Sequence, residues 1–273
     1  MISSPLEKIS FIGGGQMAEA LIKGITSGGL WPPDSVYCSE PLEARRQYLE
    51  DTYGIKTFSD NSQAVSGADI ILLAVKPQVM EMVLSDIRAS VTPEHLVISI
   101  AAGISLFQLE AGLEKGVRVI RVMPNTPALV QEGAAALCTG SFATPTDMEK
   151  AMELFSAVGK AVEVPESLMD AVTGLSGSGP AYCFMFIEAL IQAGIREGLP
   201  RPIASELAIQ TVLGSARMCQ DTGRHPEELA AMVTSPGGTT IHGMYYLHKQ
   251  GLSAGVMDAV RAAASRSRQL GKK

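Results

Sequence analysis

Two glycines and an alanine near the N-terminus have the spacing of a dinucleotide-binding loop. Gly13, Gly15 and Ala18 follow the apolar run 8–12 and precede a helical stretch, which gives G-x-G-x-x-A between a strand and a helix. The first glycine permits a tight turn, the second lets the backbone approach a pyrophosphate, and the alanine lets the helix pack closely on the strand. The free N–H groups of the helix start would bind the anion. A purely structural glycine turn is the alternative.

An acidic residue stands where such loops usually have their ribose ligand. Glu40 follows the apolar run 36–39. A carboxylate there accepts a hydrogen bond from the 2′-hydroxyl and repels a 2′-phosphate, which favours NADH. Arg45 and Arg46 lie close behind and would instead bind a phosphate. Since a solvated glutamate at a strand end is equally consistent, the coenzyme preference stays open.

The histidines and cysteines do not indicate a metal site. The histidines pair with no carboxylate at ligand spacing, and the four cysteines form no CxxC pair or tight cluster, which favours reduced thiols in a cytoplasmic protein. The chain start lacks the apolar run of a signal peptide. The most apolar window, 181–195, contains Glu188 and Gln192 and is too short for a membrane span.

Net charge and hydropathy indicate which kinds of molecule the protein binds. The 273 residues have a formal net charge of -6, which argues against nucleic-acid binding. The apolar fraction of 46% excludes disorder. A mean hydropathy of +0.18 suggests more apolar surface than one subunit can bury, so we expect an oligomer.

The chain has two parts that differ in their hydrophobic pattern. Apolar runs that alternate with helical stretches predict a doubly wound, Rossmann-type α/β sheet over residues 1–165, with strands at 8–12, 36–39, 70–75, 96–100, 117–122, 134–137 and 161–164. The intervening helices are expected at 17–26, 42–51, 79–89 and 146–158. An all-α domain is expected over 166–273, with helices at 168–197, 201–222, 225–233, 239–250 and 253–270.

Five further segments carry a family resemblance over essentially the whole chain. In order, they are 74–77 (AVKP), 99–103 (SIAAG), 123–127 (MPNTP), 174–182 (GLSGSGPAY) and 235–241 (SPGGTTI). With the glycine loop, this set resembles the pyrroline-5-carboxylate reductases. The two segments in the second half are far more specific than the glycine loop.

The resemblance implies reduction of the cyclic imine 1-pyrroline-5-carboxylate to proline with NADPH or NADH, the last step of proline biosynthesis. It implies a Rossmann domain followed by a helical dimerisation domain, with homodimers that assemble into a larger ring such as a decamer. Coenzyme contacts then fall on Gly13, Gly15, Gln16, Met17, Glu40, Asn61, Ala74, Val75, Lys76, Pro77, Ala101 and Ala102. Substrate contacts fall on Glu166, Ser176, Thr239 and Thr240, and a second subunit completes the pocket. Glu40 departs from the serine often found there.

The chemistry of an imine agrees with the residues present. A ketone becomes an alkoxide and needs a strong acid beside it, whereas a cyclic imine can arrive protonated. No lysine lies between Lys160 and Lys249, so the helical-domain lysine of the related β-hydroxyacid dehydrogenases is missing. This gap favours an imine over a hydroxy acid.

The threonine pair begins a predicted helix. Its N–H groups suit the substrate carboxylate, and Thr240 is our candidate donor to the ring nitrogen. Helix N-capping is the alternative interpretation. Likewise, the segment 176–180 has two interpretations. It is either a turn that starts a helix, or a segment whose small side chains leave space for the substrate beside Ser176.

Three other segments remain ambiguous. The assignment of Glu166 to the substrate site rests on the resemblance alone. The backbone of Lys76-Pro77 is expected to touch the coenzyme, because ligands bind at the carboxyl ends of parallel strands. Asn125 either shapes the nicotinamide pocket or forms a turn. A reductase for another cyclic imine or a keto acid, and a silent dinucleotide-binding regulator, are the rival functions.

Overall fold

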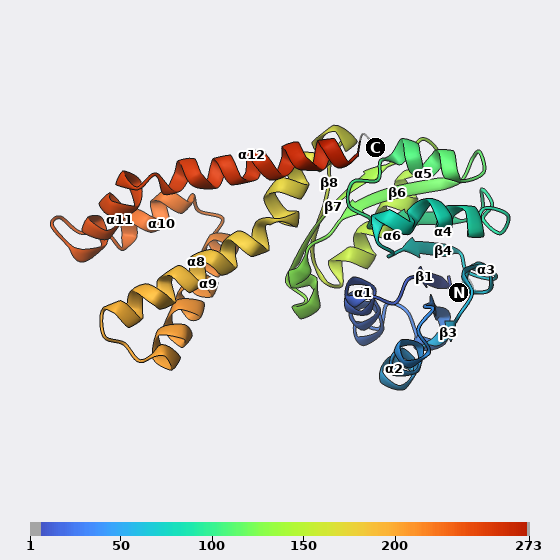
Figure 1. The fold of residues 1–273 in the computed structure, drawn as a ribbon, viewed down its shortest axis with the longest axis horizontal. Coiled ribbons are helices and arrows are strands. Elements are labelled where there is room, and N and C mark those ends of the chain that lie inside the picture. The colour runs from blue at the N-terminus through green and yellow to red at the C-terminus, as the bar shows by residue number, and fades with distance from the viewer. Residues whose placement is uncertain (1–6, 272–273) are drawn as a thin grey trace. The chain divides into compact units, whose positions relative to one another are not determined.

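A computed structural model describes residues 7–271 (Figure 1). Its elements form two compact units. The sheet unit comprises the described residues up to Ser178 and from Ala262 on, and the helical unit is Gly179–Arg261. The domain boundary after residue 165 stays a prediction.

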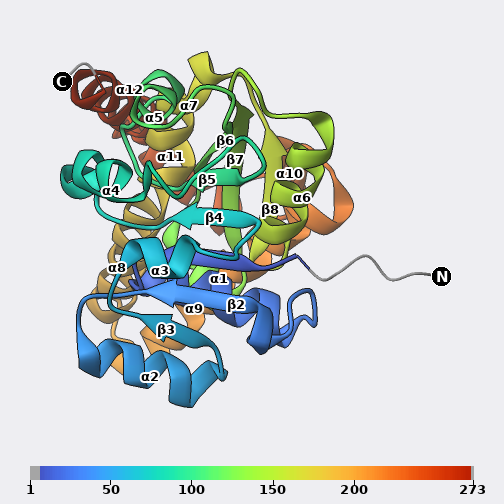
Figure 2. The same ribbon diagram turned by 90° about the vertical axis from the view of Figure 1, so that its right-hand side faces the viewer.

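The sheet unit is built on eight strands in the order β3-β2-β1-β4-β5-β6-β7-β8 (Figure 2). Neighbouring strands are parallel except β6 and β7, which are antiparallel. Every predicted strand forms, and β3 is an additional one at the sheet edge. The bounds are β1 (Ile9–Ile12), β2 (Val36–Ser39), β3 (Lys56–Phe58), β4 (Ile70–Leu73), β5 (Leu96–Ser99), β6 (Arg118–Met123), β7 (Gly133–Thr139) and β8 (Gly159–Glu163).

Helices cover both faces of this sheet because its central strands are apolar on both. Phe11 belongs to the core on one face and Ile12 to the core on the other. The first core packs against α1 (Gln16–Ser27), α2 (Glu43–Tyr53) and α6 (Pro145–Ser156). The second packs against α3 (Asn61–Val65), α4 (Met80–Ile87), α5 (Leu106–Gly112) and α7 (Met169–Val172). This confirms the doubly wound fold.

The strand order reverses at β1, which lies between β2 and β4. In open sheets of this kind, ligands bind at the carboxyl ends of the strands near such a reversal. The loops after β1, β2, β4, β5 and β6 all leave that carboxyl edge. The predicted coenzyme segments 13–17, 40, 74–77 and 101–102, which follow four of these strands, therefore meet there.

The segment 168–197 is not one uniform helix, so that prediction was wrong. After α7, a π-helical turn covers Thr173–Gly177, and α8 (Gly179–Arg196) follows. The glycines, serines and threonine of residues 173–178 are weak helix formers. In addition, Pro180 has no N–H for a hydrogen bond to the carbonyl four residues before it, that of Ser176. The regular hydrogen-bond pattern therefore breaks at this point.

The helical unit consists of α8, α9 (Arg201–Thr222), α10 (Pro226–Met232), α11 (Thr239–Lys249) and the first part of α12 (Leu252–Leu270). A small core joins α8 to α9 through Ile191, Ala204 and Ala208. Gly194 lets the two helices approach closely, since a Cβ there would lie 3.2 Å from that of Ala204. Many large apolar side chains of this unit stay exposed in the single chain, among them Phe184, Met185, Leu213, Met232, Tyr246 and Met257.

Candidate functional site

The glycine loop connects β1 to α1 at the carboxyl edge. Gly13 has φ +98°, and a Cβ there would lie 2.9 Å from Val75 Cγ1 and 3.0 Å from the carbonyl oxygen of Ala74. A Cβ on Gly15, in contrast, would meet none of the described atoms within 4 Å. No side chain caps α1 at Gly15, so the first N–H groups of the helix stay free for an anion. The loop thus offers the space and the donors that a pyrophosphate needs.

Glu40 is fastened beside this loop by both carboxylate oxygens. Oε2 accepts a hydrogen bond from the Gly14 N–H at 3.1 Å, and Oε1 accepts one from the Leu42 N–H at 3.0 Å. The half-buried side chain therefore holds its charge at the end of β2, where the adenine ribose binds in folds of this class.

Arg45 fixes the other side of the loop. Its Nε donates to the Gly14 carbonyl at 2.7 Å and its Nη2 donates to Glu19 Oε2 at 2.5 Å. Glu19 Oε1 also accepts from Tyr48 and Tyr53 at 2.9 and 2.8 Å. Burial acts to raise the pKa of Glu19, but the hydrogen bonds from Arg45 and the two tyrosines outweigh it and lower this pKa. Sequence reasoning missed this clamp.

Arg46 is also engaged by the backbone. Its Nη1 donates to the carbonyls of Glu40 and Pro41 at 2.8 and 2.9 Å. Together with the contacts of Arg45, this assigns both arginines a structural role beside the loop. Arg46 uses only Nη1 in these contacts, so they do not exclude the alternative in which the arginines bind a phosphate.

The remaining predicted coenzyme residues of the sheet unit gather at the same edge. Asn61 begins α3, and its Oδ1 accepts from Ser39 Oγ at 2.5 Å at the end of β2. The segment 74–77 follows β4, and Ala101 and Ala102 follow β5. Their contacts with a coenzyme stay a prediction.

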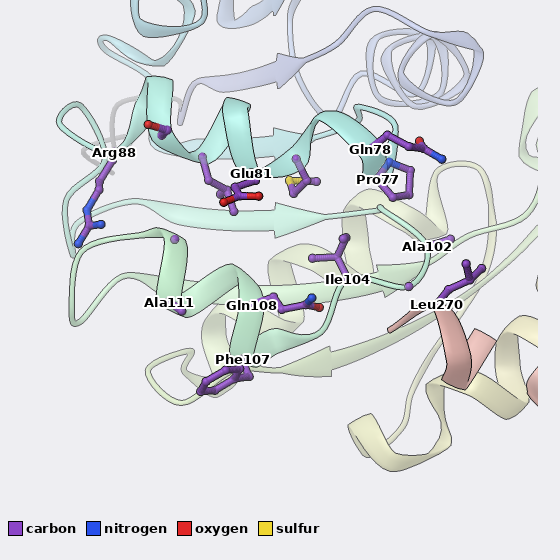
Figure 3. Close-up of a pocket in the computed structure, with 15 residues that line it drawn as sticks. Pro77, Gln78, Glu81, Arg88, Ala102, Ile104, Phe107, Gln108, Ala111 and Leu270 are labelled. Carbon is purple, nitrogen blue, oxygen red and sulfur yellow. The ribbon is translucent and has the colours of Figure 1, made fainter. Parts of the chain in front are cut away.

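A groove of about 820 Å³ continues from this edge between α4 and α5. Pro77 and Ala102 line one end of it, where Leu270 of α12 also lies, and Arg88 lies at the other end (Figure 3). Phe107 on its rim is 79% exposed. The sequence does not predict this groove.

Glu166 is held by two groups of the sheet unit. Its Oε1 accepts from the Leu106 N–H at the start of α5, at 2.7 Å, and from Arg121 Nη1 at 3.0 Å. Arg121 lies in β6 and is 8% exposed. A buried cation requires a polar or charged partner. The arginine within an otherwise apolar predicted strand was therefore the sequence signal that could have indicated this ion pair. A substrate contact from Glu166 stays a prediction.

Ser176 lies in the π-helical turn, beside the end of β6. Asn125, two residues after β6, donates through Nδ2 to the Ser176 carbonyl at 3.0 Å. The Ser176 hydroxyl donates to the Val172 carbonyl at 3.2 Å. Since a hydroxyl has one proton and two lone pairs, its oxygen stays available as an acceptor. The structure thus brings Ser176 to the edge that carries the glycine loop.

Thr239 and Thr240 are the first two residues of α11 in the helical unit. The N-cap is Gly238, and no side chain caps this helix, so the N-capping interpretation of the threonines was wrong. Thr239 is exposed and Thr240 is half-buried. Their place beside a coenzyme stays a prediction.

Three further features of the described part of the chain concern metal binding, membrane-spanning helices and thiol reactivity. Among residues 7–271, no three His, Cys, Asp or Glu side chains come together in a way that would hold a metal ion. Within the same range, no helix is both long and apolar enough to cross a membrane. Burial raises the pKa of Cys38 and Cys138 to about 12, which keeps both thiols protonated.

Known proteins match the chain over nearly its whole length. The family model described as pyrroline-5-carboxylate reductase dimerisation matches residues 166–270, and the one described as NADP oxidoreductase, coenzyme F420-dependent, matches residues 8–103. The pyrroline-5-carboxylate reductase of Methanosarcina acetivorans is 50% identical over 267 residues, which cover 98% of this chain and 99% of that protein. The chain belongs to the pyrroline-5-carboxylate reductase family.

Solved structures of pyrroline-5-carboxylate reductases have the same fold. The protein from Coxiella burnetii aligns with a TM-score of 0.93 at 35% identity, over 98% of this chain and 100% of that one. The protein from Plasmodium falciparum, whose structure has NADP bound, aligns with a TM-score of 0.87 at 34% identity, over 97% and 98%. The chain thus has the Rossmann-type sheet and the helical dimerisation domain of the pyrroline-5-carboxylate reductases.

Proposed function

We propose that this protein reduces 1-pyrroline-5-carboxylate to L-proline with NADPH or NADH, as the last step of proline biosynthesis. The observation that carries the proposal is that the glycine loop and Ser176 lie at the same edge of one sheet, in a chain that belongs to this family throughout. A silent dinucleotide-binding regulator would need the loop but not the serine turn.

The coenzyme residues suit a dinucleotide. The backbone of Gly13, Gly15, Gln16 and Met17 would hold the pyrophosphate, because the space beside Gly15 and the start of α1 provide the room and the N–H groups. Asn61, Ala74, Val75, Lys76, Pro77, Ala101 and Ala102 would line the rest of the site. The bound coenzyme supplies the hydride for the imine carbon.

The chain's own groups would orient the imine and complete the amine. The N–H groups at the start of α11, next to Thr239, would hold the substrate carboxylate. Ser176 Oγ, whose hydroxyl donates a hydrogen bond to the Val172 carbonyl, would accept a hydrogen bond from the protonated ring nitrogen. When the ring nitrogen arrives without its proton, Thr240 would donate a hydrogen bond to it and pass on a proton, which solvent water then replaces on the hydroxyl. Glu166 would complete the substrate site beside the start of α5.

We further propose a preference for NADH. Glu40 holds a negative charge beside the glycine loop through two backbone N–H groups. Arg45 and Arg46, the nearest cations along the chain, are engaged by carbonyls and by Glu19. A 2′-phosphate would therefore be repelled by the Glu40 carboxylate.

The chain carries a dimerisation domain, and we propose that homodimers assemble into a larger ring such as a decamer. The exposed apolar side chains of the helical unit support burial against a second copy. The helical unit of that copy would complete the substrate pocket. We place the protein in the cytoplasm on the basis of its free thiols. Light scattering of the purified protein measures the assembly size.

Steady-state oxidation of NADH and of NADPH with 1-pyrroline-5-carboxylate tests the proposal. Turnover with proline as product supports it, and absence of turnover with both coenzymes overturns it. Turnover on a keto acid but not on the imine would instead favour the rival reductase.

Thr240→Ala tests the role of the hydroxyl, with Thr240→Ser as the matched control. Loss of a general acid typically costs about 10²–10⁴-fold in rate, so kcat should fall by about 100-fold while coenzyme affinity stays within about twofold. Thr240→Ser should retain most of the activity. Weakened coenzyme binding in Thr240→Ala would assign Thr240 to the wrong ligand.

A further inference from the structure

Asn125 is a buried amide whose polar atoms are both used at the carboxyl edge of the sheet. It is the N-cap residue of the short helical turn Thr126–Val130, but its side chain makes no capping hydrogen bond. Its Oδ1 accepts from the Ala134 N–H at 2.8 Å, and its Nδ2 donates to the Ser176 carbonyl at 3.0 Å. One side chain therefore joins the beginning of β7 to the turn that contains Ser176.

The Ser176 carbonyl needs this donor because of the residue four positions later. In a regular helix the N–H of residue 180 would donate to it, but Pro180 has none. The neighbouring Ser178 N–H bonds to the Thr173 carbonyl at 2.8 Å, in the π-helical pattern. Asn125 thus supplies the hydrogen bond that the proline removes.

Packing places the same turn on β6. A Cβ added to Gly177 would lie 2.6 Å from Met123 Cε, so the backbone of the turn rests directly on the last residue of that strand. The hydrogen bond from Asn125 and this close approach act at adjacent residues. Together they fix the position of Ser176 relative to the end of β6.

We propose that Asn125 is a positioning residue for Ser176. The proposal rests on the assignment of Ser176 to the substrate site. Loss of the amide donor leaves the Ser176 carbonyl without its partner and releases the turn, so that the hydroxyl oxygen no longer lies where the ring nitrogen arrives. Because displacement of a reacting group by about 1 Å can cost about 10²-fold in rate, we expect a loss in kcat/KM of that order with coenzyme affinity retained.

Asn125→Asp is the most informative variant, because it keeps the shape and the acceptor for Ala134 but replaces the donor that faces the Ser176 carbonyl. It is combined with Ser176→Ala in a double-mutant cycle. The quantities measured are kcat and KM for the imine, coenzyme affinity by fluorescence titration, and the melting temperature. Val130→Ala, an exposed change in the adjoining turn, is the control and should match the unmodified protein.

If Asn125 acts through Ser176, the double variant should be no more than about threefold worse than the poorer single variant, and coenzyme affinity should change by less than about twofold. Multiplicative losses, or weaker coenzyme binding by Asn125→Asp, would overturn the proposal. Full activity of Ser176→Ala would overturn it too, together with the substrate role of Ser176, while proline formation by the unmodified protein would still support the overall function.

Asn125→Ser covers the case in which Asn125→Asp does not fold. It removes the amide donor to the Ser176 carbonyl without introducing a charge. The same pattern is expected, namely a lower kcat/KM with retained coenzyme affinity. Unchanged kcat/KM in a folded Asn125→Ser protein would contradict the positioning role of Asn125.

Discussion

The substitution Gly15→Ala separates coenzyme binding from folding. The new methyl group would meet none of the described atoms within 4 Å, and the backbone there has φ -70° and ψ -177°, which alanine adopts readily. The methyl group would, however, occupy the space proposed for the pyrophosphate. We therefore expect a protein that folds normally but binds the coenzyme poorly.

Both magnitudes follow from the local geometry. Alanine is a poorer N-cap than glycine by up to ~1 kcal/mol. The lower conformational entropy of the unfolded alanine chain stabilises the folded state by about 0.4–1 kcal/mol, so the free energy of unfolding should change little. Hydrogen bonds to a charged group contribute about 1.5–3 kcal/mol each. Loss of one N–H contact to the pyrophosphate should thus weaken binding by roughly 10–100-fold.

Fluorescence titration with NADH and thermal unfolding of the same preparation provide the assay. Gly13→Ala is the contrasting variant, since its φ of +98° and the carbonyl 3.0 Å from the new Cβ predict clear destabilisation. Unchanged NADH affinity in Gly15→Ala would refute the pyrophosphate assignment. A large fall in its melting temperature would show that the space is needed for folding.

Three further predictions use charge and protonation. Glu40→Ser should raise the NADPH/NADH ratio of specificity constants by about tenfold or more, because a unit charge about 4 Å away contributes up to ~4 kcal/mol before screening. An unchanged ratio in steady-state kinetics would show that Glu40 does not act at the ribose site. Glu19→Gln should be less stable than the unmodified protein at about pH 7, because hydrogen bonds from Arg45 and two tyrosines lower the pKa of Glu19 below its ordinary 4.5. That stabilisation is present above pH 4.5 and is lost as the pH falls through the lowered value, so melting curves of the two proteins should converge in acid; a gap that widens there would contradict the sign. Cys38 and Cys138, whose pKa burial raises to about 12, should resist a thiol reagent until the protein unfolds; rapid labelling of either, located by mass spectrometry, would contradict their burial.

The elements that the sequence predicts are those with strong local patterns. The glycine loop and the apolar strands are encoded by neighbouring residues, so their order and place could be read directly. In contrast, β3 is a strand of three residues with an exposed lysine, and α5 has only seven residues. Neither is long enough to show a hydrophobic period, and the structure was needed to find them.

The contacts that hold the site together are mostly long-range. Glu166 pairs with a residue 45 positions away, and Asn125 bonds to a residue 51 positions away. Arg45 reaches back 31 residues to Gly14. Residue type indicated that these side chains needed partners, but only the folded arrangement identifies which ones.

The helical unit is an insertion within the sheet unit, because the chain leaves the sheet unit after Ser178 and returns to it at Ala262. The returning piece is anchored, since Ser267 Oγ donates to Asp170 Oδ1 at 2.6 Å. Truncation after residue 178 would therefore leave Asp170 unmatched and remove Leu270 from the groove wall. Excision of the insert with residue 178 joined to 262 by a flexible linker is the natural way to obtain the nucleotide-binding half alone.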